Sequence, residues 1–327
     1  GTGIEENSFV RVVREDIQKE GLLYAGTERG IYMSTDAGQS WHKWQRNLPT
    51  VPITDLVVHG NDLVVATQGR SFWILDDLSP LREYTEEMRS MKVHMFDVGD
   101  SHKVLRSAMR RQGPMGKNPY YGTEVKFFLR DIDEEDSTVL KVEFMSEDMN
   151  VLRSYSSDNE LKQNKIDLKE GFHILRWGGG VEGFELPKGV MPPRGSQGFI
   201  ESFSVVPGKY NAKLSYGDYE KISSFEILPD PRNEIDESHF TRKSVLMKDI
   251  HDDISDIYSS LKKMQSARDQ LDDLGSRLSD EKFSKISELS KSTVKLIDDT
   301  ELKLISPKQK TFQDVINFRN QLDAQFL

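Results

Sequence analysis

Two stretches of the chain repeat one pattern 40 residues apart, and this internal repeat constrains the fold more than any other feature. Residues 22–32 and 62–73 each contain an apolar strand, a small residue before a threonine, a polar turn with glycine, and an aromatic strand. The matching threonines are Thr27 and Thr67, whose spacing falls in the range of about 40 to 50 residues for a four-stranded propeller blade. A chance similarity of two β-hairpins is the alternative. We expect roughly one and a half to two blades in residues 9–80, whereas a closed propeller has about four to eight.

A turn signature follows the first of these stretches. Residues 34–41 have the form S-x-D-x-G-x-x-W, with Ser34, Asp36, Gly38 and Trp41 at the fixed positions. In such a turn Asp36 accepts hydrogen bonds from amides, Gly38 supplies a positive φ, and Trp41 packs back onto the blade. The signature resembles the Asp-box of BNR-type propellers, which lies on blade turns away from the chemistry. We therefore expect a structural role for these four residues.

Further stretches carry a closer resemblance. Residues 21–30, 47–49, 53–59 and 66–78 are similar to the end of the propeller in large bacterial sortilin-like or BNR-repeat proteins, many of which are labelled glycosyl hydrolases. That family usually has histidine where this chain has Gln68, so no role of that histidine transfers. The resemblance implies a bacterial extracytoplasmic protein, which is periplasmic, exposed on the cell surface or secreted.

The start of the chain bears on this interpretation. Residues 1–3 read GTG without methionine, and a strand-like run begins at Phe9. Two blades alone would leave strand edges and an apolar blade face uncovered. We therefore expect an N-terminal propeller region, on the same or a separate polypeptide, as a partner of this chain; a tag remnant before a complete protein is the alternative.

The middle of the chain predicts an Ig-like β-sandwich. Several short runs of alternating apolar and polar residues are separated by turn signals, at residues 125–129, 139–144, 151–155, 173–177 and 210–216. Residues 206–214 and the exit at 227–232 are similar to the final hairpin of the flagellar hook-cap type of Ig-like domain. We expect Trp177 in the core. The loop after it, to Gly195, is either a lid or a segment that packs on the propeller, and we favour packing.

A basic segment precedes the sandwich. Residues 101–123 contain five basic residues and no acidic one: Lys103, Arg106, Arg110, Arg111 and Lys117. The segment could hold an anionic glycan, a lipid headgroup or an acidic neighbouring domain. We favour a solvated connector that pairs with the carboxylates of the protein itself.

The C-terminal part predicts helices, because glycine and proline nearly vanish after Ser238. Apolar residues recur at spacings of mostly three and four along one predicted helix, at Ile250, Ile254, Ile257, Leu261, Met264, Leu271, Leu274 and Leu278. A second stripe follows a predicted break at residues 275–280, at Phe283, Ile286, Leu289, Val294 and Ile297. This pattern favours an antiparallel helical hairpin, with a third short helix at residues 312–326. An apolar stripe left over after hairpin formation would bind other envelope proteins.

The predicted fold class is multi-domain and mainly β with an α-helical C-terminus. It combines partial β-propeller blades in residues 1–80, a basic connector in 81–122, an Ig-like β-sandwich in 123–232 and a helical hairpin or coiled-coil-like region in 233–327.

Composition and motifs argue against most chemistry. A net charge of −10 disfavours nonspecific nucleic-acid binding, and the absence of cysteine excludes disulfides and thiolate metal sites. We expect no membrane span in this chain, because no apolar run reaches the length of about 18 residues. The seven histidines are scattered, and no nucleotide-binding motif occurs. We therefore expect no catalytic residue, no cofactor and no metal.

One constellation remains as a candidate ligand site. Arg70, Trp73 and Asp76 lie beside a blade turn, where an arginine and an aromatic ring can face a sugar or a peptide. We favour the alternative of an Arg–Asp pair beneath a packed tryptophan. Neither the two facing carboxylates of a glycosidase nor the tyrosine, glutamate and arginine set of a sialidase can be assembled from these blades.

Two functional hypotheses follow. The first is a noncatalytic protein-interaction or ligand-binding component of a sortilin-like propeller protein in the bacterial cell envelope, as part of a larger chain or complex. The alternative is the C-terminal accessory region of a sialidase-like glycoside hydrolase whose catalytic blades lie upstream. We favour the first hypothesis.

Overall fold

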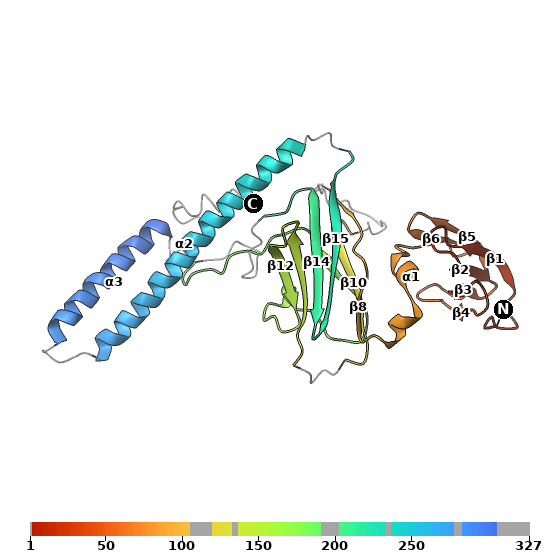
Figure 1. The fold of residues 1–327 in the computed structure, drawn as a ribbon, viewed down its shortest axis with the longest axis horizontal. Helices are drawn as coiled ribbons and strands as arrows, with labels where there is room; N and C mark the ends of the chain where they lie inside the picture. Colours follow the sequence, from red (N-terminus) through yellow and green to blue (C-terminus); the bar gives the residue numbers. More distant parts are fainter. Residues whose placement is uncertain are drawn as a thin grey trace. The chain divides into compact units, whose positions relative to one another are not determined.

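The computed structural model describes residues 2–104, 120–132, 137–190, 203–232, 237–277 and 283–305. The chain is mainly β, with several sheets, and ends in a pair of packed helices, which confirms the expected fold class (Figure 1). It divides into two compact units. The first comprises Gly1–Asp97, Lys126–Asp133 and Lys169–His173, and the second comprises Val98–Val125, Glu134–Leu168 and Ile174–Leu327.

The first unit begins with two antiparallel sheets. One has the strand order β1-β2-β3-β4, with β1 at Val10–Glu15, β2 at Leu23–Thr27, β3 at Gly30–Ser34 and β4 at His42–Lys43. The other has the order β5-β6-β7, with β5 at Ile53–His59, β6 at Asp62–Thr67 and β7 at Phe72–Leu75. In each sheet an apolar strand, a turn with glycine and an aromatic strand follow one another, at β2–β3 and at β6–β7.

The two sheets share one apolar core, formed by Val12, Leu22, Tyr24, Ile31, Ile53, Leu56, Leu63, Val65 and Leu78. The backbones approach closely at Gly26, where an added Cβ would lie 2.6 Å from Cγ2 of Ile53 and 2.7 Å from Cγ1 of Val12. Only glycine fits such a spacing without a shift of the neighbouring side chains. The sheets are followed by α1 at Ser79–Glu83 and by a 3-10 turn at Glu86–Ser90.

A third sheet has the order β13-β10-β8, with β8 at Val93–Met95, β10 at Thr123–Leu129 and β13 at Gly171–Trp177. The second unit contains a five-stranded sheet in the order β12-β11-β14-β15-β9. Its strands are β9 at Ser101–Lys103, β11 at Leu140–Ser146, β12 at Val151–Ser156, β14 at Gly208–Tyr216 and β15 at Tyr219–Pro229, and a 3-10 turn lies at Lys162–Asn164. Strand β9 pairs in parallel with β15, and the other pairs are antiparallel.

Aromatic side chains fill the core beside the five-stranded sheet. Trp177 is buried, as its sequence context predicts, and it stacks on Phe144 with ring centroids 4.4 Å apart. Tyr210 and Phe225 meet Trp177 edge to face. The indole N–H of Trp177 donates to the carbonyl oxygen of Gly180 (2.8 Å), so the buried polar atom is satisfied.

The C-terminal helices are α2 at Glu237–Arg277 and α3 at Ser284–Leu304. The predicted break begins too early, because Gly275 lies inside α2, where an added Cβ would meet no atom within 4 Å. Helices tolerate a glycine near an exposed end at a cost of about 1 kcal/mol. The buried stripe of α2 contacts more than α3: Ile254, Tyr258 and Leu261 form a cluster with Val190 and Ile305.

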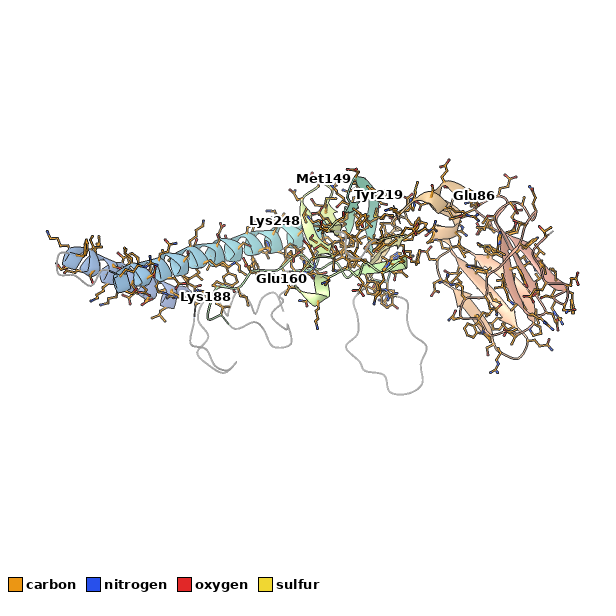
Figure 2. The ribbon with its side chains drawn as sticks, turned by 90° about the horizontal axis from the view of Figure 1, so that it is seen from below. Glu86, Met149, Glu160, Lys188, Tyr219 and Lys248 are labelled. Carbon is orange, nitrogen blue, oxygen red and sulfur yellow. The ribbon has the colours of Figure 1, made fainter. Side chains whose placement is uncertain are left out.

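The sequence favours packing of the loop after Trp177 on the propeller, but the described part of this loop packs on α2 through Phe184, Leu186 and Val190. The rest of this loop, like the predicted helix at residues 312–326, lies outside the described residues. A buried polar cluster fixes this contact. The amide of Gln265 accepts from the backbone N–H of Lys188 and donates to its carbonyl oxygen, both at 3.0 Å, and it also donates to Glu301. Figure 2 shows Lys188 beside α2.

Candidate binding surfaces

The turn at residues 34–41, which resembles an Asp-box in sequence, is held together by its own polar groups. The hydroxyl of Ser34 donates to Asp36 (2.7 Å) and accepts from the amide of Gly38 (2.9 Å), whose φ is +84°. The carboxylate of Asp36 also accepts from the hydroxyl and the amide of Ser40. The hydrogen bonds from Ser40 and Ser34 lower the pKa of Asp36 to about 2. Trp41 is buried against the β2–β3 hairpin, so this arrangement supports a structural role for the turn.

Arg70, Trp73 and Asp76 differ in burial. Trp73 is half-buried against the core between the two sheets, and its indole N–H donates to the backbone carbonyl of Arg70 (2.9 Å). The side chains of Arg70 and Asp76 are exposed, and among the described residues no ion pair joins them. The neighbouring Asp77 pairs with Lys126 instead. A ligand-binding role for Arg70, Trp73 and Asp76 stays a prediction.

One face of the β5–β6–β7 sheet is apolar and partly exposed. Three of its side chains are exposed to a large extent: Val57 at 48%, Phe72 at 76% and Ile74 at 59%. In the strand register Val57 lies opposite Val64, Val64 opposite Ile74, and Ala66 opposite Phe72, so these five residues form one continuous patch. We call this patch the outer face. Contiguous apolar patches of this kind are characteristic of interaction sites.

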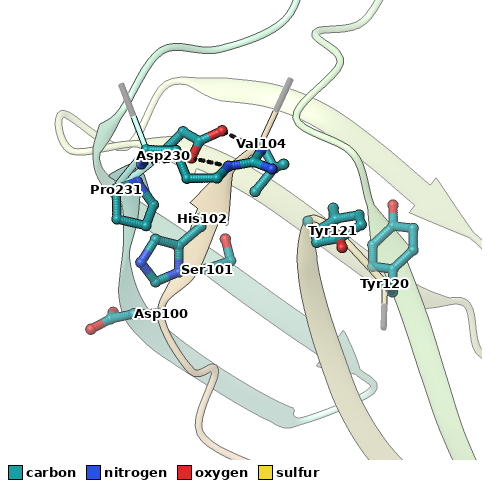
Figure 3. Close-up of a pocket in the computed structure, with 10 residues that line it drawn as sticks. Asp100, Ser101, His102, Val104, Tyr120, Tyr121, Asp230 and Pro231 are labelled. Carbon is teal, nitrogen blue, oxygen red and sulfur yellow. Dashed lines mark hydrogen bonds and ion pairs between the residues drawn. The ribbon is translucent and has the colours of Figure 1, made fainter. Parts of the chain in front are cut away.

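A polar hollow lies at the edge of the five-stranded sheet, with a cavity volume of about 400 Å³. The buried carboxylate of Asp230 accepts two hydrogen bonds from the guanidinium of Arg232, at 2.8 and 2.6 Å, which raises the pKa of Arg232. Tyr120 and Tyr121 lie across the hollow from Asp230 and His102 (Figure 3). Aromatic rings together with fixed charged groups are suited to a polar ligand such as a sugar.

The predicted basic segment overlaps this hollow only in part. Lys103 lies on β9 and contacts the hydroxyl of Ser204. Arg106, Arg110, Arg111 and Lys117 lie outside the described residues.

The first unit contains a buried ion pair that no sequence pattern indicates. The side chain of Asp16 is fully buried, and Oδ1 accepts from Nε of Arg82 (2.8 Å) and from the amides of Gln18 (2.8 Å) and Lys19 (3.1 Å). The hydroxyl of Tyr24 donates to Oδ2 (3.3 Å). Burial acts to raise the pKa of Asp16, but the hydrogen bonds from Arg82 and the two amides outweigh it and lower this pKa. Both carboxylate oxygens of Asp16 thus accept hydrogen bonds, which indicates that the cluster has a structural role.

The described residues show no arrangement for metal chemistry. Within them, no group of three or more histidine, aspartate or glutamate side chains is placed to hold a metal ion. His94, for example, contacts Glu83 (3.0 Å) and packs between Phe96 and Phe128. No described helix is long and apolar enough to span a membrane.

Comparison with known proteins gives only distant similarity. No family model matches the sequence, and no curated protein matches it. Two solved structures of the extracellular domain of BT4673 from B. thetaiotaomicron are similar, each at 10% identity and a TM-score of 0.20; one is named a one-component system and the other a hybrid two-component system. The alignments cover 69% and 68% of this chain but 26% of each of those chains, so this chain spans about a quarter of their length. Similarity at this TM-score does not establish a shared function.

Proposed function

We propose that this chain is a noncatalytic binding component of a larger assembly in the bacterial cell envelope. The observation that supports it is the outer face, where Val57, Phe72 and Ile74 are exposed side by side on one sheet. Covering a side chain of this size contributes about 1.5 to 3 kcal/mol, so three of them provide a substantial part of the free energy that a stable contact needs. An apolar sheet face of this kind binds another protein surface and performs no chemistry.

The remaining parts of the proposal concern organisation and partners. We propose that residues 1–80 form the last blades of a propeller, 81–122 a connector, 123–232 an Ig-like module and 233–327 a helical region. The partners are a further propeller region, on the same or another polypeptide, and other envelope proteins that contact the helices. Exposed apolar residues on α3, namely Ile286, Leu289 and Leu296, support the second kind of contact.

The test is the size of the native assembly. The chain, tagged in cells that produce it, is extracted under nondenaturing conditions and its mass compared with 37.5 kDa. We expect a larger assembly that is lost in the double variant Phe72→Ser, Ile74→Ser. The matched control is Val151→Ser, since Val151 is 53% exposed on β12, an edge strand of another sheet. A native chain that migrates alone at its own mass would show the proposal to be wrong.

A second candidate function is supported by the polar hollow. We propose, as the alternative, that this region binds glycan as an accessory part of a glycoside hydrolase, because Tyr121, His102 and Arg232 line a hollow large enough for a small saccharide. The test is binding of a panel of oligosaccharides to the full chain by calorimetry. We expect Tyr121→Ala to abolish the signal and Val151→Ser to leave it intact; a panel without any binding rejects this candidate.

A further inference from the structure

The two sheets of the first unit are equivalent in register as well as in sequence. Val10 lies opposite Thr27 in the first sheet and Ile53 lies opposite Thr67 in the second, and an irregularity in pairing follows directly in both. The registers therefore match β1 with β5, β2 with β6 and β3 with β7. Any position in one sheet can thus be compared with its counterpart in the other.

This comparison shows what the outer face lacks. The registers equate Tyr24 with Val64, Ile31 with Phe72, and Met33 with Ile74. In the first sheet Tyr24 and Ile31 are buried because the second sheet covers them. In the second sheet their counterparts are less covered: Val64 is half-buried and Phe72 is exposed. Ile74 is also exposed, whereas its counterpart Met33 packs against the core. The outer face is therefore the same surface that, one repeat earlier, is covered by a sheet.

The same comparison can be made between β5 of the second sheet and β1 of the first sheet. Ile53 and Leu56 on β5 are buried against the first sheet. Their counterparts on β1, Val10 and Val13, are exposed. Each sheet of the pair therefore has exposed apolar residues on the face that points away from the other sheet, where a further sheet could pack in the same way.

We propose that the outer face binds a further β-sheet of the same repeat, which presents apolar residues at the positions of Ile53, Leu56, Leu63 and Val65. This inference rests on the proposed binding function and names its partner and surface. The partner sheet continues the series, and the existing interface between β1 and β5 is the template for the contact.

The residue at one position restricts which sheet can bind. Gly26, whose added Cβ would lie 2.6 Å from Cγ2 and 2.9 Å from Cβ of Ile53, corresponds to Ala66 in the second sheet. Ala66 has that Cβ, so a partner at the same spacing carries glycine or alanine where β5 has Ile53. A second copy of this chain would present Val10 there, with the same branched Cβ, and it fits less well. Asp55 lies opposite Ala66 at the end of the outer face, and its charge is already paired with Arg14 (2.8 Å).

The absence of cysteine makes a direct test possible. Ile74→Cys and the control Val151→Cys are each introduced as the single thiol, and maleimide reaction rates are measured on the isolated full chain and on the native assembly. We expect both to react readily in the isolated chain. In the assembly we expect the reaction at position 74 to slow about tenfold, as for a site covered in nine-tenths of the molecules, and the reaction at 151 to be unchanged.

A benzophenone maleimide at position 74 then identifies the partner. We expect the cross-linked peptide to come from another sequence than this chain. It should be a strand with apolar residues at alternate positions and with glycine or alanine at the position that faces Ala66. Cross-linking to a helical segment, or to residues 9–17 of a second copy, overturns the inference. An assembly in which position 74 stays reactive also overturns it, and the chain is then a component of an assembly that forms through another surface. A chain found alone rejects both.

Discussion

Replacement of Asp16 by alanine tests whether the buried ion pair holds the first unit together. The change removes the acceptor for Arg82, for two backbone amides and for the hydroxyl of Tyr24. Arg82 keeps its hydrogen bonds to Asn61 (2.7 Å) and to the carbonyl of Gly60 (2.9 Å), but its charge becomes unpaired in a site where its own side chain is 10% exposed. Removal of one partner of a buried pair costs about 3 to 5 kcal/mol.

The assay is urea unfolding followed by tryptophan fluorescence, because Trp41, Trp44 and Trp73 belong to the first unit and only Trp177 to the second. At a urea dependence of roughly 1.5 kcal/mol per molar, a loss of about 4 kcal/mol lowers the midpoint by roughly 2 to 3 M. The control is Lys43→Ala, which breaks an exposed pair with Glu5 and is expected to cost at most about 1 kcal/mol.

The pH dependence gives a second, independent readout. The pKa of Asp16 is lowered in the folded chain, since the hydrogen bonds from Arg82 and the amides outweigh the effect of burial. The carboxylate therefore contributes stability above its unfolded pKa of about 3.9, and this contribution is lost as the pH falls through the folded pKa. Asp16→Ala should remove this acid dependence. If the urea midpoint of Asp16→Ala lay within about 0.5 M of that of the Lys43→Ala control, the stabilising role of the buried ion pair would be refuted.

Three further changes have defined outcomes. Gly26→Ala should destabilise the first unit by about 1 to 3 kcal/mol in the same fluorescence assay, because its Cβ would clash with β1 and β5 side chains; a loss below about 0.5 kcal/mol would mean that the sheets pack more loosely. Gly275→Ala should stabilise α2 by about 0.5 to 1 kcal/mol in thermal melts followed by circular dichroism, and no gain would place this residue outside the helix. The carboxyl of Asp36 should titrate by NMR at a pKa of about 2, so its stabilising effect is lost as the pH falls from 3.8 to 2. In Ser40→Ala this pKa should rise toward 3.8, and an unchanged pKa would contradict the assigned hydrogen bonds.

The sequence predicts most features that local patterns determine. The 40-residue repeat predicts strands and hairpins in residues 9–80, because apolar runs and turn residues determine strands directly, whereas the matching registers of the two sheets are seen only in the structure. The apolar stripes likewise predict α2 and α3. The features that were missed depend on residues far apart in the chain. Asp16 and Arg82 are 66 positions apart, and no pattern links them before the fold brings α1 to the end of β1.

The candidate site was predicted less well than the fold for the same reason. Arg70 and Asp76 flank Trp73 in the sequence, but alternation along β7 turns Trp73 toward the core. Arg70 precedes β7 and Asp76 follows it, and both side chains are exposed. The hollow at Asp230 joins β9 to the end of β15, which are separated by more than a hundred residues. Only the Asp-box turn, whose polar contacts all lie within seven residues, could be anticipated residue by residue.

The composition of β7 supports the proposal that a further sheet covers the outer face. A strand with one solvated face alternates apolar and polar residues, whereas a strand covered on both faces is apolar throughout. Strand β3 has the second pattern, and Ile31 and Tyr32 on its opposite faces are both buried. Strand β7 reads Phe, Trp, Ile, Leu, with Trp73 and Leu75 in the core but Phe72 and Ile74 exposed. The sequence of β7 is thus that of a strand between two layers. Among the described residues of the first unit one of these layers is present, and the sheet that we propose as partner would supply the other.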